Sequence, residues 1–221
     1  MYVTEPDVFL AGLYPHSKEF LKHYPESLHP YCGKGYGIWQ YPNQFAKYLN
    51  MVMQYDIDTY LEIGTAAGGT FMFTADKLRK FKGTKKFYAI DIAPLGTTNY
   101  LVNKNIPSPF KNSFKKYLIE HSDCSFYQSD ITRFLNNNKV DSLGLVLIDG
   151  DHSYNGCKKD YEAVKDISNI IAFHDITNDD CPGVRVFWNE IKLNPNYEAY
   201  EFTEQYFTDK SFLGMGVLVK K

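Results

Sequence analysis

The sequence has few cysteines, no long apolar run and no excess of charge of one sign. Its four cysteines, Cys32, Cys124, Cys157 and Cys181, lie far apart without a paired metal-binding spacing, which indicates reduced thiols. No apolar stretch approaches the ~20 residues of a membrane helix, and the N-terminus has neither a basic start nor an apolar run. These absences disfavour secretion and membrane insertion and predict a cytoplasmic protein.

The charge is nearly balanced, with a formal net charge of -2. Lysines are scattered over the predicted helix faces, so a nucleic-acid backbone would find no dedicated basic stripe. We therefore expect no nucleic-acid partner. A chain of 221 residues is long enough for one α/β domain with a buried core and too short for two comfortable ones.

The most informative stretch is Tyr60–Thr70, where an apolar strand leads into a glycine turn that opens a helix. Gly64 lets the chain turn sharply, while Gly68 and Gly69 lack the Cβ atoms that would keep a ligand off the backbone. A pyrophosphate-binding fingerprint has glycines at its first, third and sixth positions. The glycines of this turn do not follow that spacing. Glu62 would repel a phosphate and attract a cation or a hydroxyl. The stretch predicts a nucleotide-type ligand that need not be a dinucleotide.

Short apolar runs alternate with helical patterns from this stretch onward, which is typical of a parallel sheet covered on both faces. Each run ends in polar residues, and ligands bind at the carboxyl ends of such strands, so these side chains should meet at one edge. The predicted parallel strands are Tyr60–Ile63, Phe87–Ile92, Ser125–Gln128, Leu143–Ile148 and Asn169–Phe173; two further strands are Tyr200–Thr203 and Leu213–Lys220; and the predicted helices include Phe71–Phe81, Tyr154–Ser168 and Val184–Leu193.

The residues before the sheet differ in character. Pro42 begins a predicted helix with apolar residues at helical spacing. Ahead of it, Tyr31–Tyr41 combines glycines with four aromatic rings. This segment is either a lid that contacts the substrate or an irregular segment packed over the sheet edge. A second long insert, Ala93–Phe110, is rich in Thr, Asn, Gly and Pro and is expected at the ligand edge.

The glycine turn, followed by these parts in order, resembles motif I of class I S-adenosylmethionine-dependent methyltransferases, whose cofactor carries an amino acid and a sulfonium but no phosphate. The resemblance implies a Rossmann-like α/β fold with a seven-stranded sheet, in which five parallel strands are joined by a terminal antiparallel pair and helices cover both faces. It also implies one methyltransferase domain over residues 1–221. Residues 1–59 would form a helical or lid elaboration, and residues 60–221 the cofactor-binding core.

The resemblance assigns the strand-end acids to the cofactor. Asp91 ends the second strand, where a carboxylate can accept hydrogen bonds from both ribose hydroxyls. Asp130 ends the third strand, where the family places a residue on the adenine amino group, but it is equally placed as the N-cap of a helix at Ile131–Leu135. Glu62 would face the cationic ammonium or sulfonium group. The predicted cofactor site comprises Glu62, Gly64, Thr65, Ala66, Gly68, Gly69, Thr70, Asp91, Ile92, Asp130, Ile131 and Asp149.

The run Asp149–Tyr154 places three ionisable side chains at the end of the fourth strand. It resembles metal-assisted O-methyltransferases of the catechol and caffeoyl-coenzyme A groups, in which an aspartate here binds a divalent cation and a residue three positions later is the base. Asp149 matches the aspartate and His152 the base, with Asp151 as the next candidate base. An imidazole with a pKa near 6.5 is mostly neutral at pH 7, which suits a base. The alternative for His152 is a helix-entrance histidine bonded to the backbone.

A consecutive pair at the end of the next strand completes the metal site in those families, and here that pair is His174 and Asp175. The resemblance therefore implies a cation site made of Asp149, His174 and Asp175. An all-oxygen site suits Mg²⁺, whereas an imidazole shifts the preference toward Mn²⁺, Fe²⁺ or Zn²⁺. We expect a divalent cation, Mg²⁺ or Mn²⁺. The alternative for His174 is a histidine hydrogen-bonded near the cofactor.

A closer resemblance rests on the aromatic segment before Pro42 and on the runs Leu-Glu-Ile-Gly-Thr, Asp-Gly-Asp-His-Ser-Tyr and Phe-His-Asp-Ile. These are similar to bacterial and phage methyltransferases related to cephalosporin hydroxylase and macrocin O-methyltransferase. The resemblance implies O-methylation of a small-molecule or sugar hydroxyl. Two other functions remain open: a non-catalytic S-adenosylmethionine-binding module in a sugar-modifying complex, and a nicotinamide oxidoreductase, which the glycine pattern disfavours. A homo-oligomer is compatible with the sequence.

Overall fold

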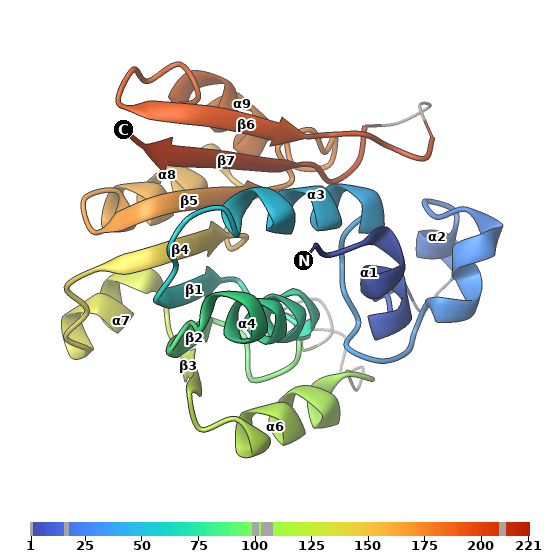
Figure 1. Cartoon of the computed structure of the whole chain (residues 1–221). Coiled ribbons are helices and arrows are strands. Elements are labelled where there is room, and N and C mark those ends of the chain that lie inside the picture. Colours follow the sequence, from blue (N-terminus) through green and yellow to red (C-terminus); the bar gives the residue numbers. More distant parts are fainter. Residues whose placement is uncertain (1, 16–17, 99–101, 103–107, 208–210) are drawn as a thin grey trace.

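The computed structural model describes residues 2–15, 18–98, 102, 108–207 and 211–221. A seven-stranded sheet runs through the molecule in the order β3-β2-β1-β4-β5-β7-β6 (Figure 1). The first five of these strands are parallel, and β7 pairs antiparallel with both β5 and β6. The predicted methyltransferase-like sheet is confirmed. Its strands are β1 (Thr59–Ile63), β2 (Lys86–Asp91), β3 (Cys124–Gln128), β4 (Leu143–Ile148), β5 (Ser168–His174), β6 (Tyr197–Phe202) and β7 (Met215–Lys220).

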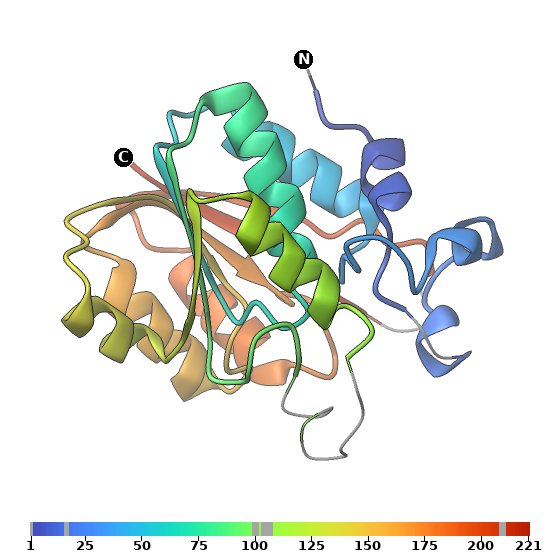
Figure 2. The same cartoon turned by 90° about the horizontal axis from the view of Figure 1, so that it is seen from below.

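Helices cover both faces of the sheet, as predicted (Figures 1 and 2). Helices α1, α3, α4 and α6 lie on one face, and α7, α8 and α9 lie on the other. Their bounds are α1 (Glu5–Ala11), α3 (Pro42–Val52), α4 (Gly69–Lys82), α6 (Lys111–Glu120), α7 (Ile131–Asn137), α8 (Tyr154–Val164) and α9 (Pro182–Ile191), with the short α2 (Lys18–Leu21) and a 3-10 helix at Glu26–Tyr31 in the N-terminal segment.

The sheet separates two apolar cores because successive side chains of a strand point to opposite faces. Tyr60 packs toward α3 and α4, whereas its neighbour Leu61 packs toward the other helices. Every residue of β4 is buried, which is expected of a central parallel strand covered on both faces. The polar residues that follow the central strands are therefore held at the edge of a rigid sheet.

Two predicted boundaries differ from the structure by three residues or more, and the others by at most two. The helix expected to reach Ser168 ends at Val164, because Ser168 is the first residue of β5 and pairs with Leu143. Strand β6 begins at Tyr197, three residues before its predicted start, because Tyr197 pairs with Lys220 at the outer edge of the sheet. The acidic residues of this edge strand hide the alternation that would mark it in the sequence.

The N-terminal segment packs onto the same core as the sheet. Ile38 and Tyr41 are buried, and Leu13 bridges to both Cys32 and Ile38. This arrangement agrees with the interpretation of Tyr31–Tyr41 as an irregular segment packed over the sheet edge. A lid motion of the segment stays a prediction. In the insert Ala93–Phe110, residues 99–101 and 103–107 lie outside the described residues. No helix within the described ranges has the length and apolar character needed to span a bilayer.

Candidate active site

A cavity of about 790 Å³ lies along the carboxyl ends of the central strands. It follows β1, which stands between β2 and β4, at the point where the strand order reverses and where open α/β sheets bind ligands. Trp39, Tyr14 and Phe20 of the N-terminal segment form part of its wall. The lining includes every predicted cofactor residue except Gly68, together with His152, Asp151 and Asp175.

The glycine turn after β1 is required by packing more than by ligand access. Gly64 and Gly68 adopt left-handed backbone angles, with φ of 86° and 84°. A Cβ on Gly68 would lie 2.4 Å from the ring of Phe114, and one on Gly69 would lie 2.2 Å from the carbonyl oxygen of Gly37. The expectation that the missing Cβ of Gly68 makes room for a ligand is therefore wrong, because that position faces Phe114 and not the cavity. Gly64 and Gly69 do line the cavity.

Asp91 is held at the end of β2 by backbone N–H groups. One of its oxygens accepts from Ala66 N at 2.8 Å, and the other accepts from Ala93 N at 2.7 Å. Burial raises its pKa above the usual value for an aspartate. Each carboxylate oxygen has a second lone pair, so the arrangement still allows two hydroxyl donors. The neighbouring Ile92 is 64% exposed and offers an apolar surface at the cavity.

Asp130 caps helix α7. Its Oδ1 accepts a hydrogen bond from Arg133 N at 3.1 Å, as the N-cap alternative predicted. Because Asp130 also lines the cavity, its role toward adenine stays a prediction.

Glu62 lies beneath the glycine turn and is 1% exposed. Tyr60 donates its phenolic hydrogen to Glu62 Oε2, but burial still raises the pKa of this carboxyl well above its usual range. Thr65 Oγ1 is buried at the cavity without a hydrogen-bond partner among the described residues. Burial thus favours the neutral form of Glu62, and a cationic group beside it would favour the carboxylate. The Thr65 hydroxyl is a second polar group that a ligand could bond.

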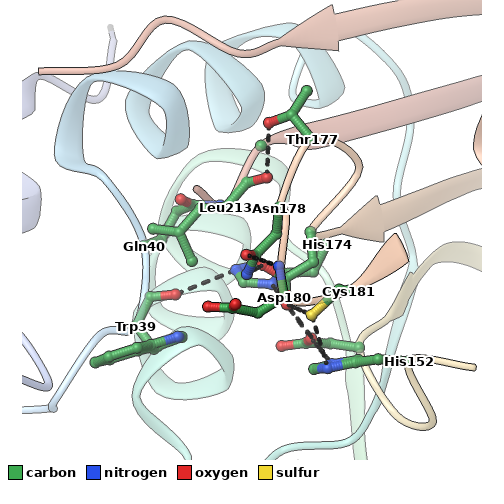
Figure 3. A network of polar contacts seen from close by, with 12 residues as sticks. Trp39, Gln40, His152, His174, Thr177, Asn178, Asp180, Cys181 and Leu213 are labelled. Atoms are coloured by element: carbon green, nitrogen blue, oxygen red, sulfur yellow. Dashed lines mark hydrogen bonds and ion pairs between the residues drawn. The ribbon is translucent and has the colours of Figure 1, made fainter. Parts of the chain in front are cut away.

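Four side chains, Asp149, His152, His174 and Asp175, form a histidine–carboxylate cluster at the ends of β4 and β5. Figure 3 shows the two histidines of this cluster. His174 Nδ1 lies 3.2 Å from Asp149 Oδ1 and 3.3 Å from Asp175 Oδ2, without the alignment of a hydrogen bond. Its other nitrogen, Nε2, lies 3.1 Å from the carbonyl oxygen of Trp39. Burial favours a neutral ring, but the charges of the two aspartates outweigh it and hold the pKa of His174 well above the usual value. The prediction that these residues meet at one site is confirmed.

His152 enters the cluster from the start of α8. Its Nε2 lies 3.3 Å from Asp149 Oδ1 and 3.7 Å from Asp175 Oδ2, while its Nδ1 lies 3.2 Å from Cys181 Sγ. The hydrogen bond to Asp149, together with the contact to Cys181, raises the pKa of His152 to about 11. The expectation of a mostly neutral imidazole at pH 7 is wrong for this arrangement, and so is the alternative of a backbone-bonded histidine.

Asp175 is held by residues that sequence reasoning did not assign to the site. Asn178 donates to its Oδ1 at 2.8 Å, and the thiol of Cys181 donates to its Oδ2 at 3.4 Å. The backbone of Asp175 has a left-handed φ of 62°, which is a cost usually borne at functional positions. Cys181 directly precedes α9 at the same carboxyl edge, and that position is the signal that could have identified it.

Comparison with known proteins identifies the family. The sequence matches the family described as a methyltransferase domain over residues 61–176, just over half of the chain. The chain belongs to this methyltransferase family. The match spans the glycine turn, Asp91 and the histidine–carboxylate cluster, and with the sheet order it confirms a class I S-adenosylmethionine-dependent methyltransferase. Comparison with curated proteins finds no match.

Solved structures share the fold at low sequence identity. An O-methyltransferase from Bacillus cereus in complex with S-adenosylhomocysteine is 14% identical, with 99% of this chain and 98% of that chain covered and a TM-score of 0.59. TomG from Streptomyces achromogenes, an O-methyltransferase of tomaymycin synthesis in complex with S-adenosylmethionine, is 13% identical, with 99% and 97% covered and a TM-score of 0.57. An rRNA methylase from Streptococcus thermophilus is 11% identical, with 80% and 96% covered and a TM-score of 0.56. Methyltransferases with this fold therefore differ in the acceptor of the methyl group.

Proposed function

We propose that this methyltransferase transfers the methyl group of S-adenosylmethionine to a hydroxyl of a small molecule or a sugar, with the assistance of a divalent cation. One observation carries the proposal: a single cavity joins the glycine turn and Asp91 at one end to Asp149, His152 and Asp175 at the other. A cofactor bound along the strand ends would therefore present its sulfonium methyl beside the histidine–carboxylate cluster.

The residues at the first end fit S-adenosylmethionine. We call this part, lined by Asp91, Ile92, Asp130 and Asp160, the nucleoside end. Asp91 has lone pairs for ribose hydroxyls, and exposed Ile92 offers a face for the adenine ring. Glu62 and the unpartnered hydroxyl of Thr65 suit the cationic amino-acid part of the cofactor. Asp149 lies where the two ends meet, so it could contact either the cofactor or the cation.

The cluster fits a divalent cation. The donors of Asp149, His174 and Asp175 lie within 4.8 Å of one another. When His174 donates its Nε2 hydrogen to Trp39, a neutral ring turns the lone pair of Nδ1 toward two carboxylate oxygens. That contact is repulsive unless a proton or a metal ion occupies the space between them. A bound ion would supply positive charge next to the acceptor oxygen.

The chain's own residues would align and activate the acceptor. S-adenosylmethionine supplies the methyl group, which passes in line from sulfur to oxygen. Asp91 would hold the cofactor, and the cavity would hold the acceptor oxygen in line with the sulfonium methyl. Such positioning can lower the activation free energy by ~7 to 11 kcal/mol. Tyr14, Phe20 and Trp39 form an aromatic wall that would exclude water beside the cluster. His152 and Asp151 are the two side chains proposed for the acceptor's proton.

Calorimetry followed by methyl-transfer assays tests this proposal. Wild-type protein should bind S-adenosylmethionine with micromolar affinity and should not bind NAD. Labelled methyl groups should then pass to hydroxyl-bearing sugars or catechols from a panel, and exhaustive chelation should suppress that transfer. Binding of NAD without S-adenosylmethionine would refute the proposal. Binding of S-adenosylmethionine with methyl transfer to nitrogen acceptors would refute O-methylation, and transfer in a protein shown to be metal-free would refute the cation.

A further inference from the structure

Four side-chain atoms of the histidine–carboxylate cluster form a closed ring. Going around it, His152 Nε2 lies 3.3 Å from Asp149 Oδ1, which lies 3.2 Å from His174 Nδ1. His174 Nδ1 lies 3.3 Å from Asp175 Oδ2, which lies 3.7 Å from His152 Nε2. Bonds of about 2.0 to 2.2 Å to one first-row metal ion place neighbouring ligand atoms about 2.8 to 3.6 Å apart. Three of the four separations fall in this range, and the 3.7 Å between His152 Nε2 and Asp175 Oδ2 slightly exceeds it. Asp149, His174 and Asp175 form a compact ligand set, and His152 lies beside it, where a small rotation of its ring would complete the set.

The outward nitrogens of the two histidines support the same assignment. Histidines that bind a metal donate their other ring N–H to a partner, which fixes the tautomer and the ring orientation. His174 has this partner in the carbonyl oxygen of Trp39, 3.1 Å from Nε2. His152 has it in Cys181 Sγ, 3.2 Å from Nδ1 (Figure 3). With both outward nitrogens engaged, each ring would present a lone pair to the centre of the four atoms once a metal ion displaces the inward proton.

The remaining contacts hold these ligands in place. Cys181 can accept from His152 Nδ1 while its own S–H donates to Asp175 Oδ2 at 3.4 Å. Asn178 donates to the other oxygen of Asp175. His174 is 2% exposed, and its Nδ1 has no hydrogen-bond partner among the described residues. A buried nitrogen that faces two carboxylates is stabilised either by its own proton or by a metal ion that replaces that proton.

We propose that His152 is the fourth ligand of a divalent transition-metal ion held with Asp149, His174 and Asp175, and that Cys181 orients His152 through its Nδ1. This inference rests on the metal assistance in the proposed function. Two imidazoles and two carboxylates favour Zn²⁺, Mn²⁺ or Fe²⁺ over Mg²⁺, which prefers oxygen ligands. His152 is then not the acceptor's base, which leaves Asp151 of the same cavity as the next candidate for that role.

Metal titrations without an acceptor separate a ligand from a base, because a base that acts only on the acceptor leaves metal affinity unchanged. Wild-type protein should bind Zn²⁺ more tightly than Mg²⁺ in calorimetry. Cys181→Ala should weaken Zn²⁺ binding by about 10- to 100-fold, as expected for an orienting partner. His152→Ala should weaken it further still. His121→Ala, a matched change at a histidine outside the cluster, should have no effect. Tighter binding of Mg²⁺ than of Zn²⁺, or wild-type Zn²⁺ affinity in His152→Ala, would overturn the assignment.

A second measurement uses the wild-type protein, in case a variant fails to fold. Nitrogen-15 NMR of the histidine rings distinguishes protonated, neutral and metal-bound nitrogens. Zn²⁺ should shift the Nε2 signal of His152 from that of a protonated ring to that of a metal-bound nitrogen, while the signals of His121 stay unchanged. Unchanged His152 signals in the presence of Zn²⁺ would overturn its role as a ligand. Affinity for S-adenosylhomocysteine is measured alongside: if cofactor binds but no metal does, the metal inference fails and the methyltransferase assignment survives.

Discussion

The two ends of the cavity are built from different kinds of contact. At the nucleoside end, two of the acids are held by backbone N–H groups: Asp91 accepts from Ala66 and Ala93, and Asp130 accepts from Arg133. At the histidine–carboxylate cluster, side chains from separate strands face one another, as His174 does with Asp149. Backbone N–H groups fix a site without adding a titratable charge, whereas facing side chains concentrate charge that a cation can balance. The first end is suited to shape recognition and the second to charge stabilisation.

The largest effect is expected from removing a charge in the cluster. Asp175→Asn should lower the free energy of unfolding by about 3 to 5 kcal/mol in the presence of a chelator, because it breaks a buried ion pair with His174. Asparagine tolerates the left-handed backbone at this position, so strain should not contribute. Urea unfolding measures the change. Asp151→Asn, a nearby exposed acid, is the control and should stay within about 0.5 kcal/mol. Equal stabilities of Asp175→Asn and wild type would mean that the buried charge pair is absent.

At the nucleoside end, the matching change is Asp91→Ala, read as cofactor affinity. Loss of a carboxylate that accepts from two ribose hydroxyls should weaken S-adenosylmethionine binding by ~2 to 3 kcal/mol. Calorimetry with Zn²⁺ on the same protein should show unchanged metal affinity, because Asp91 lies outside the cluster. Unchanged cofactor affinity would remove Asp91 from the site. A parallel loss of metal affinity would show that the two ends are not independent.

The sequence predicts which strand-end residues meet better than it predicts the partners that hold them, and the contacts explain why. Short apolar runs ending in polar residues locate the strands, so Leu143–Ile148 is predicted with its observed bounds. Asp149 and His174 then meet because β4 and β5 are neighbours. Trp39 approaches the cluster from the distant N-terminal segment, and no local pattern encodes its contact with His174. The raised pKa of His152 comes first from Asp149, three residues earlier, and then from Cys181, whose place at the same edge is known only once the strand order is known.

The glycine turn also shows that contacts from distant segments cannot be predicted from the local sequence. Its residues identify a tight turn because Gly64 and Gly68 need positive φ angles. What surrounds each glycine depends on segments far along the chain, namely α6 for Gly68 and the N-terminal segment for Gly69. The sequence therefore predicts the existence of the turn, while the reason for each glycine comes from tertiary packing.

A pH-dependent effect is expected at Asp160, a nucleoside-end acid that accepts no hydrogen bond from the described residues. Asp160 is 9% exposed, and burial raises its pKa to about 6 from the usual 3.8. The folded protein keeps this proton over a pH range in which the unfolded chain loses it. Stability is therefore lost as the pH rises from about 4 through 6.

Asp160→Asn cannot ionise and should be more stable than wild type at pH 8 by about 1 to 3 kcal/mol. The difference should shrink as the pH falls from about 6 to about 4 and should be smallest below that. Urea unfolding of both proteins across this range measures it, with Asp166→Asn, an exposed acid just after the same helix, as the control. A difference that does not vary with pH would mean that Asp160 titrates normally.

The smallest effect decides between the two roles of Asp130. As the N-cap of α7, Asp130 accepts from Arg133 N, so Asp130→Ala should cost ~1 kcal/mol of stability and change cofactor affinity by less than about twofold. Asp130→Ser retains a capping oxygen on a shorter side chain and should recover the stability. If Asp130 instead bound the adenine amino group, both variants would bind the cofactor more weakly, although the serine variant would still have normal stability. Thermal unfolding and calorimetry on the two variants therefore test whether the nucleoside end recognises adenine through this acid or through the backbone beside it.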